Sequence, residues 1–135
     1  MGIDIRCKVW LEKDGRIAFG KGRALLLKAL VEEGSLAKAA KRLNMSYRAA
    51  WGKLRASEEH LGMKLAERGP EGHHGMVLTE AGRRMLDDYE GLLSETQEFL
   101  ARQAERFAAT GQQAGAEGAK KNPPDRHPGG SANKA

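Results

Sequence analysis

The stretch GSLAKAAKRLNMSYRAAW, residues 34–51, decides the fold that we predict for this chain. Ser35 can cap a helix that begins at Leu36, because a serine oxygen accepts a hydrogen bond from the first helical turn. Apolar side chains then recur at helical spacing until Asn44, a residue that tolerates the left-handed conformation in which helices often end. Ser46 can cap the next helix only two residues later. Two short helices joined by so tight a turn are typical of a helix-turn-helix.

The helix that follows Ser46 has an apolar stripe and, beside it, a stripe of rings and charges. Ala50, Leu54 and Leu61 share the apolar stripe and are expected to face inward. The other stripe holds side chains spaced by three and four residues: Tyr47, Arg48, Trp51 and Arg55. The arginines can reach phosphates or guanine edges, and the rings offer flat contact area. An alternative for Trp51 is packing as core against a hairpin, because tryptophan is usually largely buried.

Two short hairpins are predicted on either side of these helices. Residues 3–19 alternate between apolar and polar side chains around a Lys-Asp-Gly turn, which indicates a β-hairpin. A first helix then ends at Gly34, with Leu26, Ala29 and Leu30 at core spacing. Residues 63–78 contain a short strand, a Gly-rich turn and a second short strand, which together predict a wing.

The charges of the chain, formally +5 at pH 7, are unevenly distributed. Residues 34–57 contain basic side chains and no acidic one, whereas residues 87–98 contain acidic side chains and no basic one. A patch of one sign on one element indicates a nucleic-acid-binding protein, while a merely solvated helix face usually mixes the signs. We therefore predict that the following residues, including the two histidines of the wing, contact DNA: Ser46, Tyr47, Arg48, Trp51, Arg55, Lys38, Arg42, His73 and His74.

A single long helix is predicted from Glu80 to about Ala109, with Thr79 as its N-cap. Four of its apolar side chains recur every seven residues: Leu86, Leu93, Leu100 and Phe107. A second set repeats beside them at the same interval: Met85, Leu92 and Phe99. A domain this small offers the first set no partner within the chain, so we predict that these four residues form a homodimer interface.

The sequence therefore predicts a mainly α protein with a small β component, a winged helix-turn-helix with an N-terminal β-hairpin and a long C-terminal dimerisation helix. Residues 1–110 are expected to form the DNA-binding and dimerisation domain. Residues 111–135 are rich in Gly, Gln, Ala, Lys and Pro, and we expect a disordered tail because they cannot bury enough apolar surface to offset the entropy of ordering.

Other classes of function have little support in the sequence. Cys7 is the single cysteine, so it cannot form an intrachain disulfide. We find no signal peptide and no apolar run that could cross a membrane, so we expect a cytoplasmic protein without membrane contact. The adjacent pair His73 and His74 lacks further ligands at metal-binding spacing. We expect no metal, no cofactor and no enzyme, because no phosphate loop and no nucleophile beside a base is present.

Residues 34–51 resemble the signature helix-turn-helix of the ModE-type, molybdate-responsive transcriptional regulators. The stretch LGMKLAERGPEGHHGMVLTEAG, residues 61–82, resembles the wing shared by that family and the wider LysR-type regulators. The similarity extends upstream to VWLEKDGRIAFGKGRALLLKAL, residues 9–30, and covers roughly residues 5–105. Its most specific element is the run from Ser46 to Trp51. The resemblance implies a homodimer that binds palindromic operators, with Ser46, Tyr47, Arg48 and Trp51 at matching motif positions.

The chain departs from the family in two places. Fuller members carry a C-terminal domain that binds molybdate or tungstate, whereas here we expect nothing folded after the long helix. The wing of the family is usually richer in glycine than residues 70–75, so its DNA contacts are expected to differ.

Two rival functions remain open on the sequence alone. Winged helices also serve as protein-docking modules, in which case the basic face would meet an acidic protein surface. The chain could also be the DNA-binding subunit of a larger regulator whose effector domain is on another chain.

We predict that the protein binds molybdate or tungstate no more tightly than about millimolar, a free energy of about −4 kcal/mol. A buried oxyanion site needs several convergent donors held by a rigid scaffold, and residues 111–130 are low in apolar side chains. Isothermal titration with molybdate tests this prediction. A stoichiometric micromolar site would contradict it and would indicate a pocket at a dimer interface.

Overall fold

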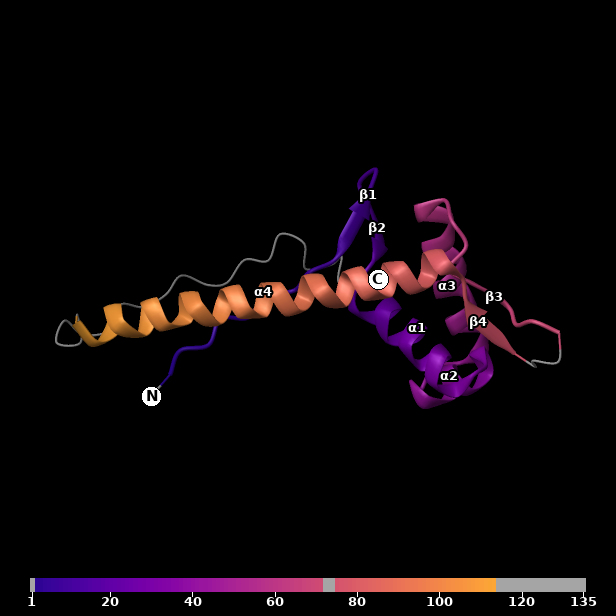
Figure 1. Ribbon diagram of the computed structural model, residues 1–135, viewed down its shortest axis with the longest axis horizontal. Helices are drawn as coiled ribbons and strands as arrows, with labels where there is room; N and C mark the ends of the chain where they lie inside the picture. Colours follow the sequence, from indigo (N-terminus) through magenta and orange to yellow (C-terminus); the bar gives the residue numbers. More distant parts are fainter. Residues whose placement is uncertain (1, 72–74, 114–135) are drawn as a thin grey trace.

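The computed structural model describes residues 2–71 and 75–113, and it forms a winged helix-turn-helix from which one long helix projects (Figure 1). The described residues form four helices, which are α1 (Lys21–Glu33), α2 (Leu36–Arg42), α3 (Tyr47–Leu61) and α4 (Glu80–Gln113). Strands of these described residues pair in antiparallel hairpins, β1 (Leu11–Lys13) with β2 (Arg16–Phe19) and β3 (Ala66–Arg68) with β4 (Met76–Leu78). This architecture confirms the predicted fold class.

The helix caps are those that the sequence predicts. Ser35 Oγ accepts a hydrogen bond from Lys38 N at 3.2 Å, and Ser46 Oγ accepts one from Ala49 N at 3.0 Å. Asn44 adopts the left-handed conformation with φ 59°, and it lies in the turn between α2 and α3. Gly34 ends α1 with φ 83°, a conformation that glycine adopts without strain. Local side-chain chemistry therefore sets the turns of the helix-turn-helix.

The N-terminal hairpin is shorter than the sequence predicts. Residues 2–10 have no regular secondary structure, although their apolar side chains alternate as they would in a strand. The reason lies in the second strand, because α1 begins at Lys21 and β2 can pair only as far as Phe19 with Leu11. A strand beginning at Ile3 would have no partner for its backbone groups.

The core lies where the first three helices meet the hairpins and the start of α4. The predicted inward residues of α1, Leu26, Ala29 and Leu30, are buried, whereas Leu25 is exposed. Leu27, which the helical spacing did not indicate, is also buried. The largest side chains of this core come from five different elements or their flanks: Phe19, Leu26, Leu27, Leu30, Leu54, Leu65 and Tyr89.

The start of α4 is fixed to the rest of the domain by polar contacts. Thr79 Oγ1 accepts a hydrogen bond from Gly82 N at 2.9 Å, as predicted for an N-cap, and donates one to Lys64 O at 2.6 Å. Nearly three turns further along, the Tyr89 hydroxyl donates to Val9 O at 2.7 Å, and its ring meets Phe19 edge to face. Burial raises the pKa of Tyr89 above its ordinary value.

The far end of α4 extends past the predicted boundary. The helix continues to Gln113, so residues 111–113, which the sequence placed in the tail, are helical. The rest of the predicted tail, residues 114–135, lies outside the described residues.

A buried carboxylate that the sequence did not single out connects α3 to the wing. Glu58 Oε2 accepts hydrogen bonds from Leu65 N at 2.8 Å and from Ala66 N at 3.3 Å. Both of these residues are buried, so their amides are shielded from water. The carboxylate therefore satisfies donors at the point where the chain turns from α3 into β3.

We predict that Glu58→Ala lowers the free energy of unfolding by about 1–3 kcal/mol, because two buried amides would lose their acceptor. Glu59→Ala is the matched control, because Glu59 follows Glu58 in α3 and its side chain is exposed. This substitution should change the free energy of unfolding by less than about 0.5 kcal/mol. Urea denaturation followed by circular dichroism measures both. Equal stability of the two variants would show that water can replace the carboxylate.

Candidate nucleic-acid interface

The outward face of α3 carries the rings and charges that the sequence assigned to it. Tyr47 is 55% exposed and Trp51 is 38% exposed, while Arg48 and Arg55 are exposed beside them. The Arg55 guanidinium carbon lies 5.7 Å from the centroid of the Trp51 ring, within the range of a cation–π contact. The alternative in which Trp51 packs in the core is therefore wrong.

The inward face of α3 holds the helix in place. Ala50 and Leu54 are buried in the core, and Leu61 packs against it. This division is the one that the sequence predicts, and it leaves the face with Tyr47 and Trp51 available to a partner.

Three polar contacts fix the C-terminal half of α3 to residues that precede the helix-turn-helix. Arg23 Nε of α1 donates to Ser57 Oγ at 2.9 Å, and burial lowers the pKa of this guanidinium. His60 Nδ1 lies 2.9 Å from Ile17 O of β2, and Lys13 Nζ of β1 donates to Leu61 O at 3.2 Å. The N-terminal hairpin therefore restrains the end of α3 that lies away from its capped start.

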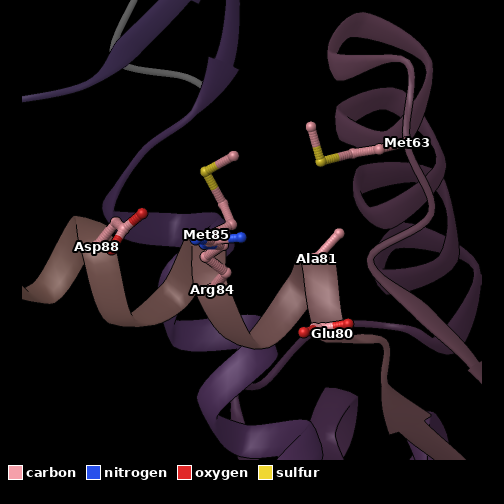
Figure 2. Close-up of a pocket in the computed structure, with 6 residues that line it drawn as sticks. All are labelled: Met63, Glu80, Ala81, Arg84, Met85 and Asp88. Carbon is pink, nitrogen blue, oxygen red and sulfur yellow. The ribbon is translucent and has the colours of Figure 1, made fainter.

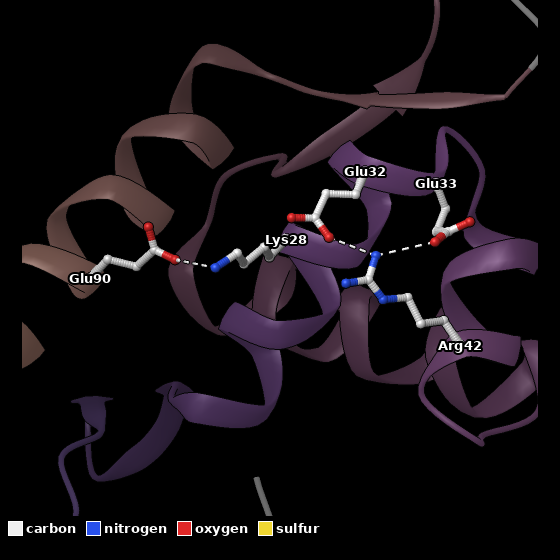
Figure 3. A network of polar contacts seen from close by, with 5 residues as sticks. All are labelled: Lys28, Glu32, Glu33, Arg42 and Glu90. Carbon is white, nitrogen blue, oxygen red and sulfur yellow. Dashed lines mark hydrogen bonds and ion pairs between the residues drawn. The ribbon is translucent and has the colours of Figure 1, made fainter.

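The basic residues of α2 are not equivalent to one another. Lys38 is exposed, as expected of a residue that contacts a partner. Arg42 Nη1, by contrast, forms ion pairs with Glu32 at 2.6 Å and with Glu33 at 3.1 Å (Figure 3). The hydrogen bond and charge of Glu32 raise the pKa of Arg42, with a smaller effect from Glu33. The stretch that has no acid in sequence thus meets two acids in space, and the charge of Arg42 is compensated.

The wing lies beside the turn that leads into α2. Gly69 N donates a hydrogen bond to Gly75 O at 2.9 Å, which joins the residue after the end of β3 to the residue before the start of β4. Gly75 has φ 133°, and a Cβ at this position would overlap the carbonyl oxygen of Gly34. Arg68 is exposed on β3 and was not among the predicted contacts. The predicted wing residues His73 and His74 lie outside the described residues.

The apolar face of α4 differs from the prediction. Leu86 is buried in the core of its own domain, and Leu93 packs against that core. The premise that these two side chains lack partners within the chain is therefore wrong, because the start of α4 folds back onto α1 and the N-terminal hairpin. Leu100 is half-buried. Three large apolar side chains of α4 remain exposed: Leu92 (39%), Phe99 (51%) and Phe107 (58%).

An open groove lies between α4 and the end of α3. Figure 2 shows Met63 and Met85 extending into it from the two sides, with Ala81 between them. The charged side chains at its border come from α4: Glu80, Arg84 and Asp88. Met85 belongs to the same set of α4 side chains as Leu92 and Phe99, so the groove continues the exposed apolar face of the helix toward its N-terminus.

Neither a metal centre nor a membrane span is found in the part of the chain that the structure describes. Within residues 2–71 and 75–113, no group of three or more His, Cys, Asp or Glu side chains could hold a metal ion. Among the helices described, none is long and apolar enough to cross a bilayer.

The fold and the face of α3 define the DNA-binding domain of a transcription regulator. Residues 23–83 match the family of bacterial regulatory helix-turn-helix proteins of the lysR family. These residues therefore form a LysR-type helix-turn-helix domain.

Known proteins with similar sequences include two curated bacterial ones. The molybdenum transport protein ModE of Azotobacter vinelandii is 36% identical over 99 residues, which are 72% of this chain and 37% of ModE. The HTH-type transcriptional regulator ClcR of Pseudomonas putida is 37% identical over 84 residues, which are 62% of this chain and 27% of ClcR. The chain thus spans about a third of the length of these relatives. Among solved structures, the CbnR_DBD–DNA complex is 35% identical and superposes with a TM-score of 0.47, covering 67% of this chain and 97% of that one.

Proposed function

We propose that this protein is a sequence-specific transcription regulator that binds operator DNA as a homodimer, with α3 in the major groove and the 63–78 hairpin as the wing. The observation that carries this proposal is the exposed face of α3, where rings and guanidinium groups lie together without an acid before Glu58. The side chain of Glu58 is itself buried and bound to backbone amides, so it does not offset this face. The match of residues 23–83 to the lysR family and the regulatory description of ClcR agree with it.

The residues of this surface have different roles in the proposed complex. Arg48 and Arg55 are exposed and are the candidates for base or phosphate contacts, because a guanidinium can bind guanine O6 and N7 or a phosphate in a bidentate manner. Ser46 uses its oxygen to cap α3, which leaves its hydroxyl proton free to donate to a phosphate. Lys38 supplies a backbone contact from α2, whereas Arg42 contributes less because Glu32 and Glu33 compensate its charge.

The second half of α4 is the proposed dimer contact. Leu92, Phe99 and Phe107 are exposed on a helix that extends well beyond the packed helices (Figure 1). Apolar side chains repeated along one face of a long helix are typical of a helix that pairs with another. A dimer of helix-turn-helix domains places its two recognition helices at half-sites about 34–36 Å apart, which predicts a two-fold symmetric operator.

We predict that Arg48→Ala and Arg55→Ala each weaken DNA binding. Loss of a base contact should cost about 1–3 kcal/mol and relax the preference at one position, whereas loss of a phosphate contact should reduce the salt slope by about one. Sites selected from genomic DNA, followed by affinity measurements at several salt concentrations, distinguish the two roles.

Arg16→Ala is the matched control for these arginines. Arg16 is exposed on β2, whose neighbour Ile17 contacts the far end of α3 through His60, so its loss should change affinity little. If the two α3 variants bound as tightly as the wild type while remaining folded, the assignment of α3 as the recognition helix would be wrong.

We predict that the double variant Leu92→Glu with Phe99→Glu is a folded monomer that binds operator DNA poorly. Both side chains are exposed in the single chain, so charge there should disrupt association without disturbing the core. Ala101→Glu is the control, because Ala101 is exposed on the opposite side of the helix, about 180° around its axis from Leu92. Sedimentation equilibrium at micromolar concentration measures the association, and a monomeric wild type would contradict the prediction.

A further inference from the structure

The two rings on α3 differ in their polar contacts from two other aromatic side chains of the domain. Trp10 donates its indole N–H to Glu12, and Tyr89 donates its hydroxyl to Val9 O. Tyr47 and Trp51 make no side-chain hydrogen bond to the described residues, and both are exposed. They are one helical turn apart, so both rings lie on the same side of the first two turns of α3.

Arg55 limits what Trp51 can present to a partner. Its guanidinium lies over the indole, 5.7 Å from the ring centroid, so one side of the ring is already occupied by a cation. The contact also restrains the ring in a position directed away from the core. The uncovered side of the Trp51 ring and the ring of Tyr47 are thus available for contact with a partner, on a helix face that also carries the positive charges of Arg48 and Arg55.

We infer that Tyr47 and Trp51 recognise thymine through its 5-methyl group. The positive charge around the rings matches DNA as the occupant of this face, and the inference rests on the function proposed above. In the major groove every base pair presents hydrogen-bond donors and acceptors, and the thymine methyl is the large apolar feature among them. A ring placed over polar base edges would leave them without hydrogen bonds, which is unfavourable, whereas a ring on a methyl group buries apolar surface on both sides.

The spacing of the two rings limits where the thymines should lie. Residues four apart on a helix are separated by about 6 Å along its axis, and stacked base pairs by about 3.4 Å. The two methyl groups should therefore lie within about two base-pair steps of each other in each half-site. Arg48 and Arg55 then contact the neighbouring guanines or phosphates.

The test uses the full chain and operator sites selected from a random duplex library. Thymidine is replaced by deoxyuridine one position at a time, which removes the 5-methyl group and keeps every hydrogen-bonding atom. Loss of one methyl contact should weaken binding about fourfold at one or two positions of each half-site, and by less than twofold elsewhere. At those positions the effect should vanish in Trp51→Ala or Tyr47→Ala.

Three variants show whether the effect comes from the rings. Tyr47→Phe keeps the ring and removes the hydroxyl, so it should remain as sensitive to deoxyuridine as the wild type. Leu25→Ala removes an equally exposed apolar side chain from α1 and should leave the sensitivity unchanged. Thermal unfolding of Trp51→Ala should match the wild type, because its side chain lies outside the core.

The outcomes separate this inference from the proposed function. Sequence-specific binding that does not respond to deoxyuridine at any position would overturn the inference and leave the proposed function standing. Equal sensitivity in the wild type and in both alanine variants would also overturn it. A protein that selects no duplex at all would overturn both.

Discussion

The close packing of α2 against α3 is the constraint on which the rest of the structure depends. Ala39 and Ala40 of α2 and Ala50 of α3 are all buried, and alanine side chains let two helix backbones approach closely. Leu54 of α3 is buried beside these alanines, whereas Tyr47 and Trp51 lie on the outer face of the same helix. The packing that buries one face of α3 therefore leaves the face with the two rings exposed.

The orientation of α3 is set from both of its ends. At its start, Ser46 caps the helix. The turn from the left-handed Asn44 to Ser46 is short, which limits how α3 can be oriented relative to α2. At its end Glu58 binds the amides of the first wing strand, while the N-terminal hairpin contacts His60. The hairpin precedes the matched residues 23–83, so this restraint on α3 comes from outside the segment that matches the lysR family.

The features that the sequence predicted are those determined by neighbouring residues. The caps at Ser35 and Ser46 and the two faces of α3 depend on side chains within a few positions of one another, and all were predicted correctly. The ion pairs of Arg42 were not, because Glu32 and Glu33 belong to the previous helix and approach it only after α1 and α2 pack. Glu58 was missed for the same reason, since its partners lie in the wing.

The long helix shows why periodicity alone could not assign an interface. The repeat of seven correctly indicates an amphipathic helix, but it does not say which turns are covered by the chain itself. Tyr89 and Leu86 join the start of α4 to the core, and Lys28 of α1 approaches Glu90 at 4.0 Å (Figure 3). Since these contacts fix α4 relative to α3, pairing of two copies through the exposed half would also fix the distance between their recognition helices. The spacing of operator half-sites would then follow from the register in which the two copies of α4 pair. A register shift of one heptad moves one helix by about 10 Å along the other. Such a shift should change the preferred distance between half-sites by about three base pairs.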